Sequence, residues 1–293
     1  MFHADIIGKN KNSQAKIRLD YFYFYHKILE IIFNHFIMLY RGKLPDVNLE
    51  NIQILAFDKD DTITPPNEPM ESSMAEEIKR LTPNRYILIL TARDIDTCRA
   101  QILEPMEQVC ERKNRVIFAC CNGSQIYAFD NQQQEYLLKS SLKGQLKPKE
   151  FFDEIGKKFA QELNAPDLYF EQRSETMGTF VCISRESSDE ERKNFDPNGD
   201  RRRAAIQKFR NLFPNEYEVI PGGKTSIDVS LYNKEAGMRH LLEYFQCPLY
   251  GDVVFFGDGF DGGNDTPVEN IPNVLSVKVE NYQQTQELLK QIP

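Results

Sequence analysis

The sequence predicts an α/β fold: a doubly wound, Rossmann-like parallel-sheet core with an inserted α+β cap domain and a helical N-terminal extension. Short apolar runs alternate with polar, helix-like stretches, and each run is followed at once by small, polar or acidic residues. Runs of this length suit strands buried on both faces of a parallel sheet. Ligands bind beyond the carboxyl ends of such strands, so the residues after each run are candidates for chemistry. The runs cover residues 52–57, 86–90, 116–121 and 253–256.

The middle of the chain has a different pattern. An amphipathic helix candidate at 150–163, a charged one at 200–213 and short strand-like pieces mix there, and the core pattern resumes after residue 231. Helix candidates between the core runs lie at 72–80 and 96–112. We expect an N-terminal extension at 1–48, a first core part at 49–130, the cap at 131–231 and a second core part at 232–293.

The composition is that of a globular protein, with 293 residues, a formal net charge of -8 and 41% hydrophobic residues. A net negative chain has no bulk attraction for nucleic acid, so we expect no nucleic-acid partner. No basic-apolar-small signal peptide opens the chain, and a cytoplasmic location is therefore the default expectation. We interpret the six cysteines as reduced, buried thiols: Cys98, Cys110, Cys120, Cys121, Cys182 and Cys247.

The segment from Tyr21 to Tyr40 is the one stretch that suggests contact with another surface. It is almost entirely apolar or aromatic, with polar residues such as His26 and Glu30 recurring at helical spacing. These polar residues argue against a transmembrane span. Two interpretations stay open: an extra helix packed on the domain or in a homodimer interface, and a helix that lies on a membrane surface.

The strongest chemical signal is a pair of aspartates, Asp58 and Asp60, directly after the apolar run at 52–57. The first carboxylate emerges at the strand end, where it can attack phosphorus and divide one difficult transfer into two easier ones. The second, two residues later, can point to the same side and pass a proton to or from the opposite oxygen. The spacing predicts phosphoryl transfer through an aspartyl-phosphate on Asp58.

A second run ends in a glycine-rich acidic loop that carries Asp258, Asp261 and Asp265. Hard oxygen ligands near a phosphate point to Mg²⁺, which keeps several waters and takes one or two carboxylates. The cation would offset repulsion between the nucleophile and an anionic substrate. We expect the metal on Asp58, the carbonyl of Asp60 and Asp258, with Asp265 in support.

Two further residues complete the predicted catalytic group. Thr91 ends the run at 86–90, where its hydroxyl can hold a phosphoryl oxygen, and Lys234 follows the inserted region. The ammonium of Lys234 can bind both the phosphate and the carboxylate of Asp58. Either residue alone is more often structural, and the order of all four motifs along the chain is what favours these roles.

The four motifs resemble the haloacid dehalogenase superfamily of phosphotransferases over roughly residues 52–289. The resemblance implies a doubly wound core with a mobile cap over the active site. The insertion follows a strand that ends Asn122-Gly123-Ser124, as in the larger α/β cap class of this superfamily. We include Asn122 among the candidate substrate-binding residues.

Within the superfamily the motifs resemble those of the eukaryotic-type phosphomannomutases. Residues 57–65 read FDKDDTITP, similar to FDxDGTLTP, and residues 222–229 match Gly-Gly-x-x-Ser-x-Asp-Val. The metal loop at 255–265 matches with one residue fewer. In that family three cap arginines, a serine and an aspartate hold the sugar phosphate. Carried over, this set is Arg173, Arg185, Arg192, Ser226 and Asp228. The match does not support Arg201, Arg202 and Arg203, which we expect to be solvated surface charges.

The resemblance implies an enzyme, a Mg²⁺-dependent hexose-phosphate mutase (an isomerase) that converts mannose 6-phosphate to mannose 1-phosphate, with a hexose 1,6-bisphosphate as candidate activator. Four features differ from the mutases. Asp61 replaces a glycine, and Thr91-Ala92-Arg93 is more usual among the superfamily's sugar phosphatases. The spacing from Arg173 to Arg185 is one residue longer than expected, and the N-terminal extension has no counterpart. A sugar-phosphate phosphatase (a hydrolase) is therefore the alternative. A second alternative is a catalytically idle, membrane-associated binding protein.

Overall fold

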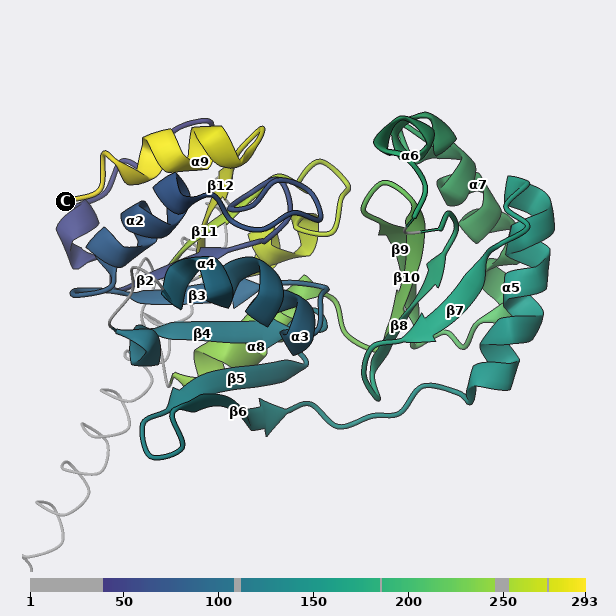
Figure 1. The fold of residues 1–293 in the computed structure, drawn as a ribbon, viewed down its shortest axis with the longest axis horizontal. Coiled ribbons are helices and arrows are strands. Elements are labelled where there is room, and N and C mark those ends of the chain that lie inside the picture. The colour runs from purple at the N-terminus through teal and green to yellow at the C-terminus, as the bar shows by residue number, and fades with distance from the viewer. Residues whose placement is uncertain (1–38, 108–111, 185, 246–252, 273) are drawn as a thin grey trace, which may run out of the picture. The chain divides into compact units, whose positions relative to one another are not determined.

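An eight-stranded sheet organises the core of the protein (Figure 1). The computed structural model describes residues 39–107, 112–184, 186–245, 253–272 and 274–293. The core strands are β1 Leu39–Arg41, β2 Ile54–Phe57, β3 Tyr86–Leu90, β4 Val116–Cys120, β5 Gln125–Asp130, β6 Glu135–Ser141, β11 Val253–Gly257 and β12 Val274–Lys278. Their order is β1-β12-β11-β2-β3-β4-β5-β6, parallel from β1 to β4 and antiparallel at β5 and β6.

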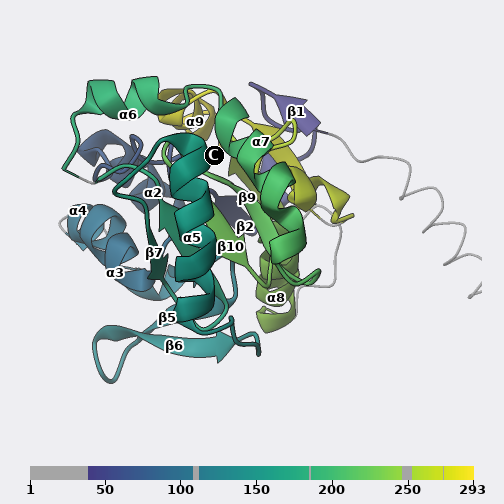
Figure 2. The same cartoon turned by 90° about the vertical axis from the view of Figure 1, so that its right-hand side faces the viewer.

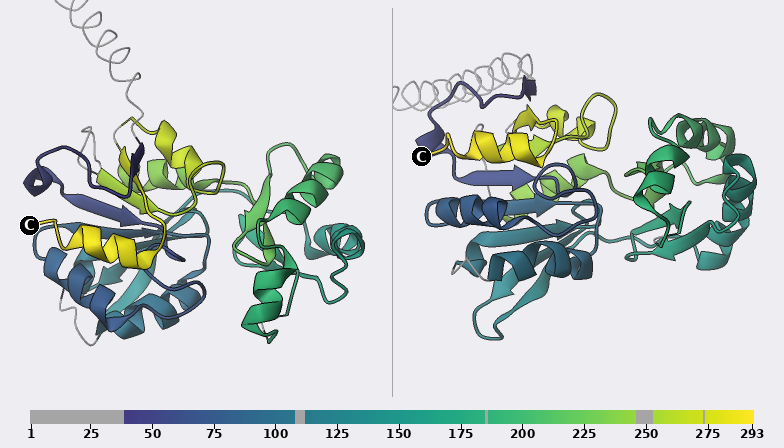
Figure 3. Two further views of the ribbon diagram at one scale, coloured as in Figure 1. Left: turned by 90° about the horizontal axis from the view of Figure 1, so that it is seen from above. Right: turned by 45° about the horizontal axis from the view of Figure 1, so that its top comes forward.

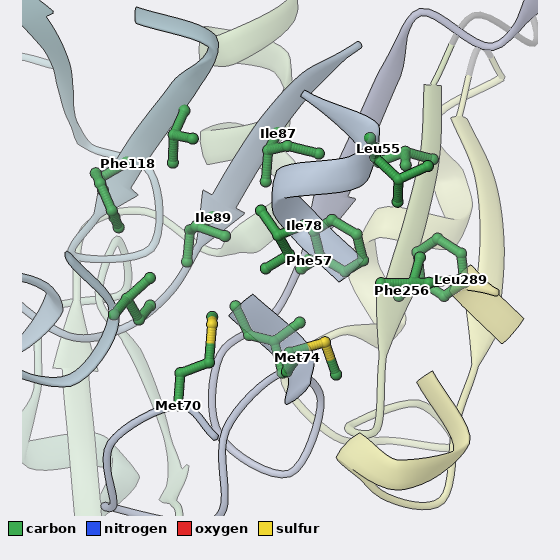
Figure 4. Packing of buried hydrophobic residues seen from close by; sticks show 14 of the residues in the cluster. Leu55, Phe57, Met70, Met74, Ile78, Ile87, Ile89, Phe118, Phe256 and Leu289 are labelled. Carbon is green, nitrogen blue, oxygen red and sulfur yellow. The ribbon is translucent and has the colours of Figure 1, made fainter. Parts of the chain in front are cut away.

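Helices cover both faces of this sheet, as the continuous apolar runs predict. Helices α2 (Ser72–Leu81) and α9 (Tyr282–Leu289) pack on one face, where Leu55 and Phe57 of β2 point (Figure 4). Helix α8 (Lys234–Tyr244) packs on the other face, where the alternate residues of β2 point. The doubly wound α/β core predicted from the sequence is confirmed.

The helix predicted at 96–112 is observed from Ile95 to Glu107, and residues 108–111 lie outside the described ranges. It runs as α3 (Ile95–Cys98), a π-helical turn (Arg99–Leu103) and α4 (Glu104–Glu107). Pro105 accounts for the irregular turn, because it has no N–H to donate to the carbonyl of Gln101. That carbonyl instead accepts a hydrogen bond of 2.7 Å from the amide of Met70. The irregular turn therefore ties the loop after β2 to the segment after β3.

The inserted part forms a second, four-stranded antiparallel sheet (Figures 2 and 3). Helices α5 (Lys149–Leu163) and α7 (Asp200–Phe209) cover one face, where Phe152 and Phe180 pack. The short helix α6 (Asp189–Phe195) precedes α7. The strand order is β7-β8-β10-β9, with bounds β7 Tyr169–Gln172, β8 Met177–Val181, β9 Glu218–Gly222 and β10 Ser226–Ser230.

The strand pairing moves two of the expected domain limits. β1 pairs in parallel with β12, so residues 39–41 belong to the core sheet although the sequence assigned them to the extension. β6 pairs with β5 in the same sheet, and we therefore place the start of the cap after Ser141 rather than at residue 131. The hairpin misled the prediction because β6 is mostly exposed and has no continuous apolar run.

The segment from Tyr21 to Tyr40 lies outside the described residues, except for Leu39 and Tyr40 in β1. No helix in the described ranges is both long and apolar enough to cross a membrane. The four cysteines in those ranges are free and buried, as predicted: Cys98, Cys120, Cys121 and Cys182. Cys110 and Cys247 fall outside them.

Candidate active site

Asp58 lies at the carboxyl end of β2, beside the fully buried Lys234. Its amide donates to the carbonyl of Phe256 on β11 (2.8 Å), which extends the parallel ladder by one residue and fixes the carboxylate at the sheet edge. Nζ of Lys234, at the start of α8, lies 2.7 Å from Asp58 Oδ1 and 2.6 Å from Asp265 Oδ1. A buried ammonium needs such partners. The packing of α8 places Lys234 beside Asp58, and the carboxylate in turn stabilises the buried ammonium.

Three carboxylates meet at this edge, since Asp58, Asp258 and Asp265 each offer an oxygen within 4.8 Å of the others. Burial raises the pKa of Asp58 to about 6 and that of Asp258 to about 8. Repulsion from Asp265 adds to both shifts, and the ammonium of Lys234 opposes both. Clustered carboxylate oxygens are hard ligands that suit a divalent cation, so the residues fit Mg²⁺.

The glycines of the metal loop leave room for Asp265. A β-carbon on Gly257 would lie 2.4 Å from an oxygen of this carboxylate, and the amide of Gly259 donates to the same group at 2.8 Å. Asp261, the third aspartate of the loop, points elsewhere: it forms surface ion pairs with Arg41 and Lys278 at 2.5 Å each. The loop thus assigns two aspartates to the site and one to the surface.

Asp60 also lies in the site, and two cations hold its carboxylate. Nζ of the buried Lys59 lies 2.7 Å from Oδ1, and Nε of Arg93 donates to Oδ2 at 3.1 Å. The amide of Asn67 donates to Oδ1 at 2.8 Å. Burial would raise the pKa of Asp60, but Arg93 and Lys59 together lower it well below its usual value. Asp60 is therefore held as a carboxylate.

Sequence reasoning assigned no role to Lys59 or Arg93. Each has a signal in the chain: Lys59 stands between the two aspartates of the motif, and Arg93 closes the Thr91-Ala92-Arg93 stretch. The signal is weak because a lone cation in a sequence is usually solvated. Only the fold shows that both cations converge on Asp60.

Asp61 occupies a left-handed backbone conformation, with φ of +58°. Glycine adopts this conformation without strain and aspartate tolerates it, which explains how Asp61 replaces the glycine of similar motifs. Its carboxylate lies 3.9 Å from Nζ of Lys224 in the cap. The substitution therefore adds an ion pair between core and cap.

A cavity of about 580 Å³ lies between the core and the cap. Asp58, Asp60 and Thr91 line it from the core, and the amide of Arg93 donates to Thr91 Oγ1 at 3.1 Å. The cap contributes the face of its sheet that α5 and α7 leave open. Residues from this face include Arg173, Glu218, Ser226 and Asp228. Three of the predicted catalytic residues and three of the predicted cap residues thus border one space, while the buried Lys234 lies behind Asp58 and does not line it.

A second cavity of about 270 Å³ adjoins the first, and Arg93, Arg173 and Ser226 line both. Arg192 and Lys224 add positive charge to it. Arg173 spans the two domains: its Nη1 donates to the core carbonyl of Ala92 at 3.1 Å and lies 3.7 Å from Asp228 in the cap. Arg185, the remaining predicted cap arginine, lies outside the described residues.

Asn122 lies at the core–cap connection and lines neither cavity. Its Nδ2 donates to the carbonyl of Tyr232 at 3.2 Å, on the segment that returns from the cap after β10. A β-carbon on Gly237 of α8 would lie only 1.9 Å from the carbonyl oxygen of Asn122. The prediction that Asn122 contacts substrate is not supported by this geometry, because the side chain is buried and holds the connection.

The prediction that Arg202 is a solvated surface charge is wrong. Its side chain is 2% exposed, and its Nε lies 2.9 Å from Oδ2 of Asp196. Its Nη1 donates to three carbonyls in and beside the turn between β9 and β10. The neighbouring Arg201 and Arg203 are exposed, as predicted. The three arginines differ because only Arg202 points from α7 toward the cap sheet.

Comparison with known structures supports the fold. N-terminally truncated IMP-nucleotidase from Plasmodium falciparum is 19% identical with a TM-score of 0.60, and the match covers 83% of this chain and 71% of that one. An IMP-bound mutant of the same enzyme is 18% identical with a TM-score of 0.59, covering 82% and 68%. A C-terminally truncated form is 20% identical with a TM-score of 0.58, covering 83% and 72%. These likenesses show a shared fold.

Comparison with curated protein sequences finds no match. The family model of the eukaryotic phosphomannomutases matches residues 101–293, more than half of the chain. The matched region contains the cap, Lys234 and the acidic loop, while Asp58, Asp60 and Thr91 precede it and are brought to the same cavity by the fold. The chain belongs to the eukaryotic phosphomannomutase family, with the fold of haloacid dehalogenase-type phosphotransferases.

Proposed function

We propose that the protein is a Mg²⁺-dependent hexose-phosphate mutase that interconverts mannose 6-phosphate and mannose 1-phosphate. The observation that carries this proposal is the arrangement of charged groups on the two sides of the cavity. An aspartate nucleophile borders it on the core side, and the cap side carries its own cationic groups, Arg173 and Lys224 among them. A substrate with phosphates at both ends can then be held by one phosphate while the other reacts.

Asp58 carries the phosphoryl group. A hydroxyl of the bound sugar phosphate attacks phosphorus, the bond between phosphorus and the Asp58 oxygen breaks, and Asp60 accepts the hydroxyl proton. After the resulting bisphosphate reorients, Asp58 attacks its other phosphorus and Asp60 returns the proton to the leaving oxygen. Lys59 and Arg93 keep Asp60 ionised and positioned as a base for the first of these steps.

Thr91 and Lys234 are proposed to hold the transferring phosphate, because Thr91 lines the cavity with Asp58, Lys234 contacts Asp58, and both can donate. Asp58, the Asp60 carbonyl and Asp258 would hold Mg²⁺, with Asp265 in support, and the ion would neutralise charge on the phosphoryl oxygens. On the cap, Arg173, Arg185, Arg192, Ser226 and Asp228 are the proposed ligands of the distal phosphate.

A phosphatase is the second candidate, and the position of Arg93 favours it. Thr-x-Arg is usual among sugar phosphatases of this superfamily, and here Arg93 contacts the carboxylate that would activate water. Both reactions share the aspartyl-phosphate and differ in the nucleophile that discharges it. A mutase must exclude water while the bisphosphate reorients.

A coupled assay on mannose 1-phosphate, run beside inorganic phosphate release, separates the two candidates. A mutase is stimulated by mannose or glucose 1,6-bisphosphate, which phosphorylates Asp58, and releases little phosphate. Stoichiometric phosphate release without isomerised sugar would decide for the phosphatase. Phosphate release should also be measured with IMP as substrate, because the structurally similar Plasmodium falciparum enzyme is an IMP-nucleotidase.

A further inference from the structure

Arg202 was not among the predicted site residues, but it borders the larger cavity and makes many contacts within the cap. Its Nη1 donates to the carbonyls of Gly222 (3.1 Å), Gly223 (2.9 Å) and Ser226 (2.8 Å). These carbonyls belong to the tight turn that joins β9 to β10. The two hydrogens of Nη1 are shared among three carbonyls, so this one group ties both ends of the turn to α7.

The charge of Arg202 is compensated away from the turn. Asp196, which is also buried, accepts from Nε at 2.9 Å and from the amide of Arg202 at 3.0 Å. It also accepts from the amide of Arg201 at 3.1 Å, so the aspartate binds two amides in the first turn of α7. Arg202 therefore connects two pieces of the cap: the junction between α6 and α7, and the turn of the hairpin.

Besides Arg202, the hydroxyl of Ser226 and a backbone hydrogen bond from the segment after β8 hold the turn, while its two glycines add no side-chain contact. A β-carbon on Gly222 would lie 2.4 Å from the carboxyl carbon of Asp228, so glycine alone fits there. Gly223 has φ of +46°, in the left-handed region, and a β-carbon there would have no neighbour within 4 Å. The two glycines allow the turn to pass close to Asp228 but add no side-chain contacts that would hold it.

The turn borders the cationic end of the cavity. Gly223, Lys224 and Ser226 line both cavities, beside Arg173. The hydroxyl of Ser226 donates to the carbonyl of Gly222 at 2.6 Å, so its direction depends on the same carbonyl that Arg202 holds. A change in the turn would therefore move Ser226 and Lys224 together.

We propose that Arg202 is a positioning residue for the cap: it fixes the Gly222–Ser226 turn in the conformation that presents Ser226 and Lys224 to the distal phosphate of the substrate. The inference rests on the proposed function, because it takes the cap end of the cavity as the site of that phosphate. Arg202 acts by holding the turn. Holding several carbonyls and a carboxylate at once requires the planar guanidinium with its several donors. A lysine at this position keeps the charge but cannot contact three carbonyls and a carboxylate at once.

The test compares Arg202→Lys with Arg201→Lys in the full chain. Arg201 is the matched control, because it precedes Arg202 on α7, is exposed and also donates to carbonyls, but borders neither cavity. For Arg202→Lys we expect KM for the hexose phosphate to rise about tenfold or more with kcat changed less than about twofold. Hydrolysis of p-nitrophenyl phosphate, which has no distal phosphate, should stay within about twofold of wild type in both variants.

Three results would overturn the proposal: equal KM values for the two lysine variants, equal loss of both activities in Arg202→Lys, or a change in kcat alone. If Arg202→Lys does not fold, as judged by circular dichroism, Asp196→Asn replaces it and should raise the same KM. Failure of the proposed function would give a different result. The wild-type protein would then show no preference for hexose phosphate over the generic ester.

Discussion

The core and cap sides of the site hold their charged groups in different ways. On the core side, two of three clustered carboxylates, Asp58 and Asp265, share the ammonium of Lys234. These groups lie after a parallel strand, in the acidic loop and at the start of α8. On the cap side, cations such as Arg192 and Lys224 lie on a short helix and a turn and are partly exposed. The clustered carboxylates of the core fit a cation, and these cap cations fit an anion.

This difference indicates a division of labour. Groups fixed by a sheet edge suit bond making and breaking, which needs precise geometry. Groups on a separate sheet suit recognition of the remainder of the substrate. The following predictions test the division, from the largest expected effect to the smallest.

Asp58→Asn should abolish activity on both the hexose phosphate and a generic ester, by at least about 10³-fold, because the amide cannot form the phosphoryl intermediate. Steady-state kinetics on both substrates measures the effect. Asp261→Asn is the matched control, since it makes the same change in the acidic loop but at a surface ion pair. Equal loss in the control, or residual activity above about one percent in Asp58→Asn, would contradict the assignment.

Removal of divalent metal should also abolish both activities, because nothing else would neutralise the carboxylates and the phosphate together. Dialysis against EDTA followed by titration with Mg²⁺ tests this, with activity and melting temperature as the two measurements. Mg²⁺ should raise the melting temperature of the wild-type protein but not of Asp258→Asn. Full activity in EDTA would exclude the metal site.

Arg192→Ala should weaken hexose-phosphate binding by about 1.5–3 kcal/mol, the scale of a hydrogen bond to a charged group. Turnover of a small generic ester should change little, because that substrate has no phosphate at the cap end. Lys193→Ala, on the same helix but outside both cavities, is the control. If both activities fell in parallel, the result would contradict the proposed division between chemistry on the core and recognition on the cap.

The smallest effect concerns the pH dependence of stability. Burial would raise the pKa of Asp196, but hydrogen bonds from Arg202 and Arg201 lower it overall. A carboxyl whose folded pKa is lowered stabilises the fold above its unfolded pKa, about 3.9, and loses this contribution as pH falls through the folded value.

Asp196→Asn should therefore be less stable than wild type at pH 7, by about 1.5–3 kcal/mol, with a difference that narrows below pH ~4. Urea unfolding between pH 7 and pH 3 measures this. The exposed Asp200→Asn is the control, because its ion pair with Arg203 lies at the surface and contributes little. A difference that grows on acidification would have the wrong sign.

The core half of the site could be predicted from sequence because its evidence is local. An apolar run followed by Asp58 or Asp258 predicts where the strand ends and which side chain lies there. The glycines of the acidic loop add the room that Asp265 needs. Parallel strand ends meet at one edge, so two local patterns sufficed to place the carboxylates together.

The cap half could not be predicted in this way, because burial of a lone cation depends on partners far away in the chain. Arg202 has the same sequence context as Arg201 and Arg203, and its carbonyl partners lie some twenty residues later. The same limit applies to Arg93 in the core, which contacts Asp60 from the end of the neighbouring strand.

The π-helical turn at Arg99–Leu103 has a local cause that the sequence contains, since Pro105 lacks the N–H that a regular helix requires.

The close packing of Gly237 against Asn122 determines how far the core can tolerate change. Gly237 lies one turn after Lys234 on α8, and a single methyl group there would collide with the carbonyl oxygen of Asn122. To make room, α8 would have to shift outward and carry the ammonium of Lys234 away from Asp58. The position of the Lys234 ammonium is thus set by a missing carbon atom where α8 meets the turn after β4. A larger residue at 237 would alter the proposed chemistry without touching any group that reacts.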